Sequence, residues 1–238
     1  MSMAERPPLQ SPFFEIGPKN LLRLPDIITV ATAAAQAGRD HGVSVILTVP
    51  TALIAQVHAA VPDVFVFAQE MGAEEQGPSV GRTTAESLMD AGADGVMLNH
   101  VGHPLEPVLL TRTMQRAERA GLLTMVCADT DEQAVEVARR GPTIVLYEPP
   151  ALIGGSGAGE RPWIRPATQQ VTQAAPGVLV MHAGGVAGPR DAYEIMRSGA
   201  HGTGSTSGVL QAPSPQLAAQ LFIEATREGY EAALSAAE

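Results

Sequence analysis

The chain is poor in cysteine and has no long hydrophobic run. Cys127 is its only cysteine, so an internal disulfide is excluded. No segment reaches the roughly 20 consecutive apolar residues that span a bilayer. Residues 1–12 also lack the apolar stretch of a secretory signal. We therefore expect a cytoplasmic protein with neither a membrane anchor nor a disulfide framework.

Positive charge is also scarce. The 238 residues carry a formal net charge of −10, whereas nucleic acids and anionic membranes bind proteins through basic surfaces. Neither is therefore expected as a partner, and an anionic ligand has to be bound by local groups. Hydrophobic residues make up 45% of the chain and charged residues 17%, which is typical of a globular protein.

Eight short hydrophobic runs recur along the chain. Most are continuous, as in parallel strands that are buried on both faces. Helix-like segments separate them, so β and α elements alternate about eight times without a linker. The pattern predicts a single (β/α)8 TIM barrel over residues 13–238, after an N-terminal extension of residues 1–12, with a doubly wound open sheet as the alternative. The predicted strands are residues 13–16, 43–49, 64–68, 95–99, 122–127, 143–147, 178–182 and 201–204.

Helix starts and stops support the same alternation. Residues Thr83–Glu86 and Thr130–Gln133 fit the capping box, in which a hydroxyl and a later Glu or Gln bond the free amides of the first turn. Ser214 followed by Pro215 predicts the start of the last helix. Glycines stand where helices are expected to end, at positions 42, 92, 121, 141 and 199.

Chemically active side chains follow three of the predicted strands. Lys19 follows the first strand, His100 the fourth and Glu148 the sixth, and the carboxyl ends of barrel strands form one mouth. Lys19 could instead be a solvated surface charge, and His100 could bond locally. Glu148 is harder to explain in such a way, because burying a carboxylate is unfavourable unless it is paired or functional.

Glycine and serine residues follow the last three strands. Gly154–Gly155, Gly184–Gly185 and Ser207–Gly208 could supply backbone amides that converge on one anion, with a short helix starting near Ser207. Glycines are also ordinary turn residues. The three sets together favour a phosphate site that needs no net positive charge.

No cofactor or metal is predicted. Residues 202–208 (GTGSTSG) contain spaced glycines, but no further strand follows to carry the acidic residue of a dinucleotide site. His100, His103 and Asp129 do not have a convincing metal-ligand spacing.

The motifs resemble those of the triosephosphate isomerase family across almost the whole chain. In its short length the chain is most similar to the archaeal branch of that family. Tyr147–Gly154 (YEPPALIG) is the most specific match, and Leu98–His100, Val66–Gln69 and Val126–Cys127 also fit. The match of residues 17–19 (GPK) to the family's Asn-x-Lys is partial.

This resemblance implies an aldose–ketose isomerase acting on a small phosphorylated sugar. Glu148 would be the base, His100 the neutral electrophile and Lys19 the charge that stabilises an enediolate, since a Glu base with an uncharged His is the known pattern of this family. A helix starting just after His100 would disfavour the charged imidazole. The loop of residues 149–155 would close over the substrate.

The resemblance also extends to phosphate binding and assembly. The predicted phosphate ligands are Gly154, Gly185, Ser207 and Gly208. The loop of residues 70–82 resembles the segment through which the family dimerises, so a homodimer or homotetramer is expected.

Several positions depart from the family pattern. Gly17 replaces an Asn, Gly102 a Glu that would interact with the lysine, and Ala187 a Ser that would contact phosphate; Val80 replaces a Thr. Three hypotheses follow. The protein is a triosephosphate isomerase, an isomerase of another sugar phosphate such as a tetrose, or a protein that binds a phosphorylated metabolite without turnover.

Overall fold

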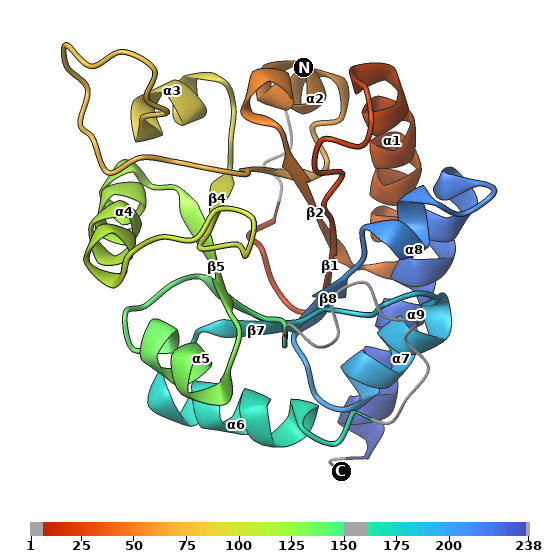
Figure 1. The fold of residues 1–238 in the computed structure, drawn as a ribbon. Helices are drawn as coiled ribbons and strands as arrows, with labels where there is room; N and C mark the ends of the chain where they lie inside the picture. Colours follow the sequence, from red (N-terminus) through yellow and green to blue (C-terminus); the bar gives the residue numbers. More distant parts are fainter. Residues whose placement is uncertain (1–6, 150–160, 237–238) are drawn as a thin grey trace.

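Eight parallel strands close into a barrel in the computed structural model, which describes residues 7–149 and 161–236 (Figure 1). The strand order is β1 through β8, with β1 also paired to β8. Helices surround the barrel on the outside. The predicted (β/α)8 barrel is confirmed, and the alternative of an open doubly wound sheet is wrong because the sheet has no edge.

The strands lie within one residue of their predicted bounds, because the continuous apolar runs are the buried strands themselves. β8 has only three residues and consists of a Gly-Thr-Gly segment. The strands are β1 Phe13–Ile16, β2 Ser44–Val49, β3 Phe65–Ala68, β4 Gly95–Leu98, β5 Leu123–Ala128, β6 Ile144–Tyr147, β7 Leu179–His182 and β8 Gly202–Gly204.

The helices vary from one turn to about six turns, and the last one, α9, packs against both α1 and α7. A 3-10 turn, η1, covers Thr51–Leu53. The helices are α1 Leu24–His41, α2 Ile54–Ala60, α3 Ala85–Asp90, α4 Pro107–Ala120, α5 Asp131–Ala138, α6 Ile164–Ala174, α7 Pro189–Arg197, α8 Ser207–Leu210 and α9 Pro215–Ser235.

Two of the three predicted N-caps are confirmed and one is wrong by a residue. The hydroxyls of Thr130 and Ser214 accept hydrogen bonds from the third amide of their helices. At α3 the cap is Thr84, which accepts from the Ser87 N–H at 3.3 Å, and not Thr83. Two adjacent threonines make the pattern ambiguous by one position. The five predicted stop glycines all have positive φ, as the left-handed turn after a helix requires.

The barrel interior and the outer layer form separate hydrophobic cores. Inward-facing residues alternate along each strand, so Phe13 and, two residues later, Glu15 point into the barrel from β1. The Phe13 ring lies against β8 at Gly202, where an added Cβ would come within 2.4 Å of it. The opposite strand faces pack against the helices in the larger core.

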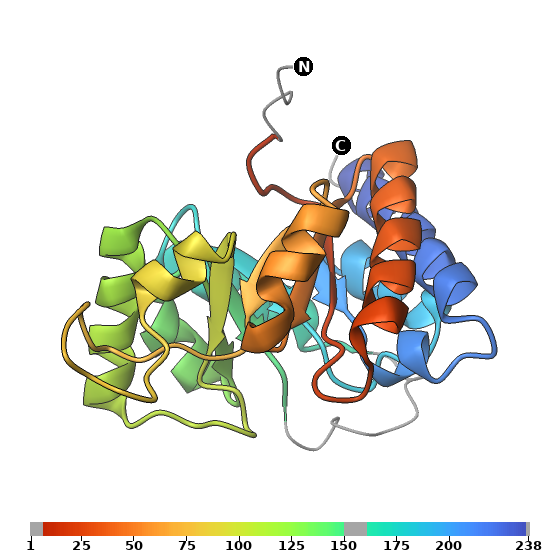
Figure 2. The ribbon, with the colours of Figure 1, turned by 90° about the horizontal axis from the view of Figure 1, so that it is seen from above.

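The loops that follow the strands gather at one end of the barrel, along the lower edge of Figure 2. At the other end, Leu9 packs against the interior core and Ser11 Oγ donates to the His201 carbonyl. Among the described residues, no helix is long and apolar enough to cross a membrane.

Candidate active site

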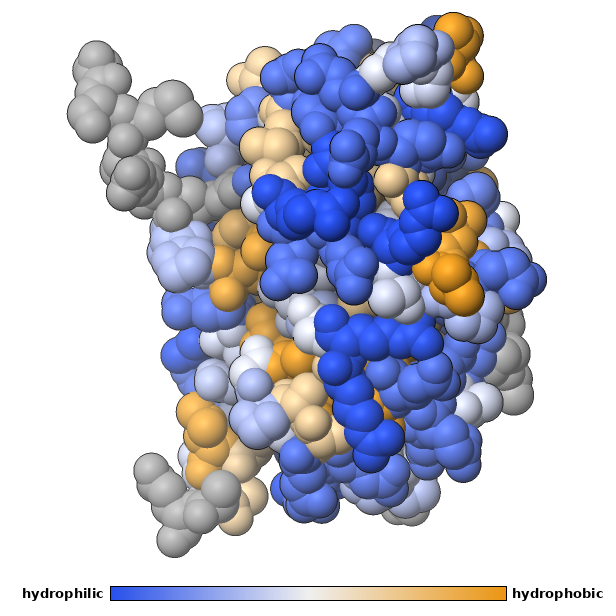
Figure 3. Space-filling model, turned by 90° about the vertical axis from the view of Figure 1, so that its left-hand side faces the viewer, coloured by the Kyte–Doolittle hydropathy of each residue, from blue (hydrophilic) through white to orange (hydrophobic). Residues whose placement is uncertain are grey.

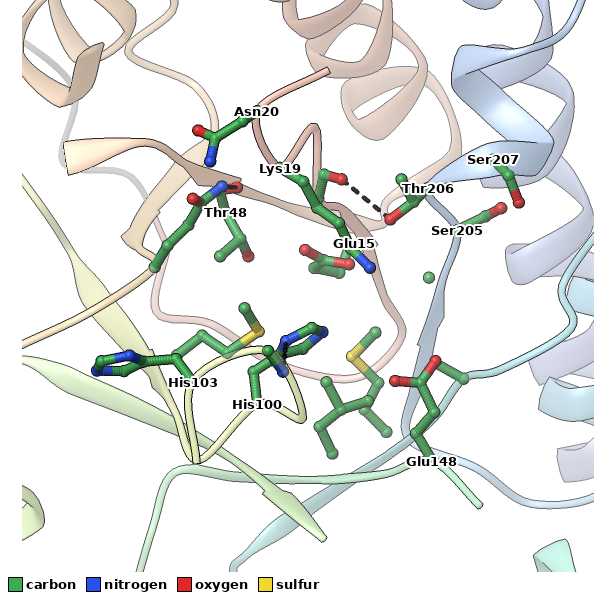
Figure 4. Close-up of a pocket in the computed structure, with 18 of the residues that line it drawn as sticks. Glu15, Lys19, Asn20, Thr48, His100, His103, Glu148, Ser205, Thr206 and Ser207 are labelled. Atoms are coloured by element: carbon green, nitrogen blue, oxygen red, sulfur yellow. Dashed lines mark hydrogen bonds between the residues drawn. The ribbon is translucent and has the colours of Figure 1, made fainter. Parts of the chain in front are cut away.

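A cavity of about 880 Å³ opens at the carboxyl ends of the strands, the size of a small-molecule site. Lys19, His100 and Glu148 all line it, although 81 residues separate Lys19 from His100 and 48 separate His100 from Glu148 in sequence. Figure 4 shows the three side chains pointing into the same space from different strand ends. The barrel therefore brings together the three predicted catalytic groups.

Lys19 lies in the loop after β1 and has an unusual backbone conformation. Its φ of 48° is left-handed, which is uncommon for a residue other than glycine. Strained backbone of this kind is found preferentially at functional sites. Lys19 is also the only lysine among the 15 lysine and arginine residues of the chain. A merely solvated cation would not require lysine where arginine serves everywhere else.

His100 is held as a neutral imidazole. The Gly102 N–H donates a hydrogen bond to Nδ1 at 3.0 Å, so Nδ1 carries no proton and Nε2 is the donor. Burial, with a smaller contribution from the Lys19 charge, lowers the pKa of His100. The prediction that a helix starts just after His100 is wrong, because α4 starts only at Pro107. A turn amide holds the ring neutral instead.

Glu148 stands immediately after β6, half-buried at the cavity wall. Its own N–H donates to the Ala128 carbonyl of β5, so the side chain has a fixed starting point on the sheet. Burial raises the pKa of Glu148; the Lys19 charge opposes this rise and Asp129 adds to it. A raised pKa makes the carboxylate a stronger base than an exposed glutamate.

The loop after β7 is built around two left-handed glycines, Gly184 and Gly185. Arg161, which is 9% exposed, donates to both of their carbonyls at 2.8 Å. Asp191 accepts from the N–H groups of Ala187 and Gly188. These contacts hold Gly185 at the cavity wall, with its carbonyl turned toward the arginine.

The other predicted phosphate ligands differ in position. Ser207 lines the cavity at the start of α8, which confirms a short helix there. The Gly208 N–H instead donates to Ser205 Oγ at 3.1 Å, and Gly208 is not among the lining residues. Gly154 lies outside the described residues, as does most of the predicted closing loop.

Two polar residues deeper in the cavity, Glu15 and Thr48, were not predicted from the strand ends. Both line its floor from inside the barrel, on β1 and β2. The signal was present in the sequence, because Glu15 is a carboxylate two residues after Phe13 in a strand of four buried residues. Period-two alternation places both Phe13 and Glu15 inside the barrel.

No group of three or more His, Cys, Asp or Glu side chains within the described residues has a geometry suited to a metal ion. Cys127 is buried on β5 in the interior core, and burial raises the pKa of its thiol, so it is a neutral core residue and not a nucleophile.

The chain matches the family model "Triosephosphate isomerase" over residues 23–219. It belongs to the triosephosphate isomerase family. Two archaeal relatives show how similar in sequence the chain is to other members of the family. The triosephosphate isomerase of Sulfurisphaera tokodaii is 28% identical over 198 residues, which cover 82% of this chain and 86% of that protein. That of Pyrobaculum calidifontis is 31% identical over 193 residues, covering 79% and 83%.

A solved structure shows the same fold at lower identity. The triosephosphate isomerase of Bartonella henselae superposes with a TM-score of 0.72 at 19% identity, covering 91% of this chain and 99% of that one. The resemblance read from the sequence is thus confirmed at the level of family and fold. The match to the family model begins after Lys19, so β1 and the loop that carries Gly17 and Lys19 lie outside it.

Proposed function

We propose that this protein interconverts an aldose phosphate and a ketose phosphate through an enediolate. Glyceraldehyde 3-phosphate and dihydroxyacetone phosphate are the first substrates to consider, because the archaeal relatives bear the name triosephosphate isomerase. Glu148 takes a proton from the carbon next to the carbonyl and returns it to the adjacent carbon. His100 donates from Nε2 to the substrate oxygens, and Lys19 balances the negative charge that develops.

The neutral state of His100 carries the proposal. The base must be deprotonated while the electrophile carries a proton to donate at the same pH. The cavity provides this difference, because Glu148 is a carboxylate of raised pKa and the Nδ1 of His100 is occupied by the Gly102 amide. A protein that only binds a phosphorylated metabolite needs neither group in that state. The amides of Gly154, Gly185 and Ser207 remain our proposed phosphate ligands, whereas the Gly208 amide is already engaged by Ser205 Oγ.

A second candidate is the same reaction on a longer sugar phosphate, such as a tetrose. It is favoured by the absence of side chains at Gly17 and Gly102, both of which line the cavity, and by the polar floor beneath them. Ala187, which is exposed on the β7 loop, likewise offers no hydroxyl to the phosphate.

Steady-state turnover of purified protein on triose phosphates, run beside four- and five-carbon sugar phosphates, tests both candidates. We expect kcat/KM above about 10⁶ M⁻¹s⁻¹ on the best substrate, toward the fast end for enzymes. A triose rate at least about a hundredfold below that on a longer sugar would select the second candidate, since a few missing contacts have this effect. Absence of turnover on every sugar would contradict the proposed function.

We also propose that the chain assembles as a homodimer or homotetramer through the loop of residues 70–82. Val80 in that loop is 93% exposed. The face shown in Figure 3 carries separate hydrophobic patches between hydrophilic ones. Several large hydrophobic residues are exposed: Val80 in this loop, Met89 in α3, Val101 in the loop after β4, and Val108 and Leu109 in α4. Sedimentation should show a species at least twice the mass of the chain, and a monomer at micromolar concentration would contradict this.

A further inference from the structure

The floor of the cavity holds a carboxyl group that the proposed mechanism does not use. Glu15 is 8% exposed and points from β1 into the space below Lys19, between Thr48 and Glu148 (Figure 4). Among the described residues no cation forms a salt bridge with it. A buried carboxylate with no ion partner is unfavourable, so its presence inside the barrel calls for a ligand or a proton.

The polar neighbour of Glu15 is also incompletely bonded. Thr48 is fully buried, and its Oγ1 has no hydrogen-bond partner of good geometry within the described residues. It still lies close enough to the Glu15 carboxyl to favour the charged form. The floor therefore presents two buried polar groups toward the cavity, and a substrate oxygen would complete their bonding.

Glu15 occupies the space that a side chain at position 17 would need. A Cβ built on Gly17 would lie 2.9 Å from Glu15 Oε1, whereas the next nearest group, Thr206 Oγ1, would be 3.6 Å away. The backbone of Gly17 is not left-handed, so the Glu15 carboxyl is the nearest group that a side chain there would meet. The family pattern has an Asn at this position, and such a side chain would start in close contact with the Glu15 carboxyl.

We propose that Glu15, as a neutral carboxylic acid, donates a hydrogen bond to a substrate oxygen and thereby stabilises the enediolate in place of the missing Asn amide. This inference rests on the proposed isomerase function. No bond to Glu15 forms or breaks in the reaction; its O–H remains a donor, as in sites where a carboxylic acid kept neutral serves as an oxyanion-hole group.

The charges around Glu15 favour its neutral form. Burial raises the pKa of Glu15 to about 7, the nearby Glu148 adds to the rise, and Thr48 and Lys19 oppose it. The other titratable group that faces it is the Cys127 thiol on β5, whose own pKa is raised. β2 contributes only Thr48, and Met181 of β7 and Gly204 of β8 are apolar neighbours of the β1 segment. Lys19 is therefore the one cation that acts on this carboxyl among the described residues.

The pH dependence of kcat/KM provides the test. In the wild type, kcat/KM should fall by about tenfold for each pH unit above about 7, as a required acid loses its proton. Glu15→Gln keeps a permanent N–H donor, so this basic limb should disappear while the maximum stays within about tenfold. Glu224→Gln is the matched control. Glu224 is an exposed carboxylate on α9 that does not line the cavity, and its removal should leave the profile unchanged.

Glu15→Leu supplies the second arm, because an apolar side chain of similar size is tolerated in place of a buried charge. We expect kcat/KM to fall by about 10² to 10³, the usual effect of removing one oxyanion donor. A phosphorylated hydroxamate, which mimics the enediolate, should lose affinity for this variant, while inorganic phosphate binds as before.

The outcomes separate this inference from the proposed function. If the wild type turns over sugar phosphates but Glu15→Gln keeps the basic limb, or Glu15→Leu keeps full activity, Glu15 is not a substrate-contacting residue and only this inference is overturned. If the wild type turns over no sugar phosphate, both fail.

Discussion

Two ends of strands in the same cavity differ in how closely they fit the family pattern. At the ends of β4 and β6, His100 and Glu148 line the cavity, with His100 Nδ1 accepting from the Gly102 N–H and the pKa of Glu148 raised by burial. At the end of β1, which lies outside the match to the family model, Gly17 carries no side chain, and a Cβ placed there would lie 2.9 Å from Glu15 Oε1. On the proposed mechanism, the groups that move the proton fit the family pattern, and the groups around the developing charge depart from it.

This difference has a physical reason. Proton transfer between adjacent carbons requires a base and a donor at fixed positions, and few other side chains can serve. Stabilisation of an oxyanion requires only a donor at the right distance, and an amide or a neutral carboxylic acid can supply it. On the proposed mechanism, the β1 end is therefore the part of the site where the sequence can change while the reaction is kept.

The largest expected effect on kcat/KM is at the end of β6. Glu148→Gln should lower kcat/KM by about 10² to 10⁴, because the base is lost while the shape of the side chain is kept. Binding of a phosphorylated substrate analogue should change little. Asp129→Asn removes a neighbouring carboxylate that raises the pKa of Glu148 but does not line the cavity, and its effect should stay within about tenfold. Equal losses of kcat/KM in the two variants would show that negative charge at this place matters, and not the action of Glu148 as a base.

The loop after β4 contains two histidines that can be compared. His100→Gln should lower kcat/KM by about 10² to 10³, because the Nε2 donor no longer reaches the substrate from a rigid ring. His103, three residues later, also lines the cavity but is exposed and points away from Lys19 and Glu148 in Figure 4. His103→Gln should leave kinetic constants nearly unchanged. Comparable losses in both would place the electrophile elsewhere.

The smallest expected effect is on stability, at the end of β1. Gly17→Ala should lower the free energy of unfolding by about 1–3 kcal/mol, because its Cβ would press on Glu15 Oε1. In a Glu15→Ala background the same change should be neutral, since the obstructing carboxyl is gone. Chemical denaturation of the four proteins of this cycle measures the coupling. Simple additivity would mean that the two positions changed independently.

Stability should also depend on pH through Glu15. Its folded-state pKa, raised to about 7, lies above the ordinary value of 4.5, so the protonated form favours the folded state. The stabilising contribution is present at low pH and is lost as pH rises through about 7. Glu15→Gln should remove this part of the pH dependence of unfolding.

Much of the fold could be predicted because its signals are local. Apolar runs marked β1 to β7 to within one residue, a Gly-Thr-Gly segment marked β8 more weakly, and five stop glycines marked helix ends. The cap of α3 was misplaced because Thr83 and Thr84 are equivalent in the pattern and only the backbone geometry distinguishes them.

The site was predictable where a residue follows a strand and less so inside the barrel. Lys19, His100 and Glu148 could be found from strand ends alone. The position of Glu15 inside the barrel could be read from its alternation with Phe13, but its significance could not, since that depends on the missing side chain at Gly17, and the closeness of the two follows from backbone geometry. The engagement of Gly208 by Ser205 is likewise a three-dimensional fact with no sequence signature.

The central claim, proton abstraction by Glu148 to form an enediolate, is tested most directly by proton NMR of the reaction in D2O. We predict that the sugar phosphate product carries solvent deuterium at the carbon next to its carbonyl in a measurable fraction of turnovers. Glu148→Gln should show neither turnover nor exchange above the uncatalysed rate. Rapid isomerisation by the wild type without any deuterium in the product, or full exchange by Glu148→Gln, would contradict the claim.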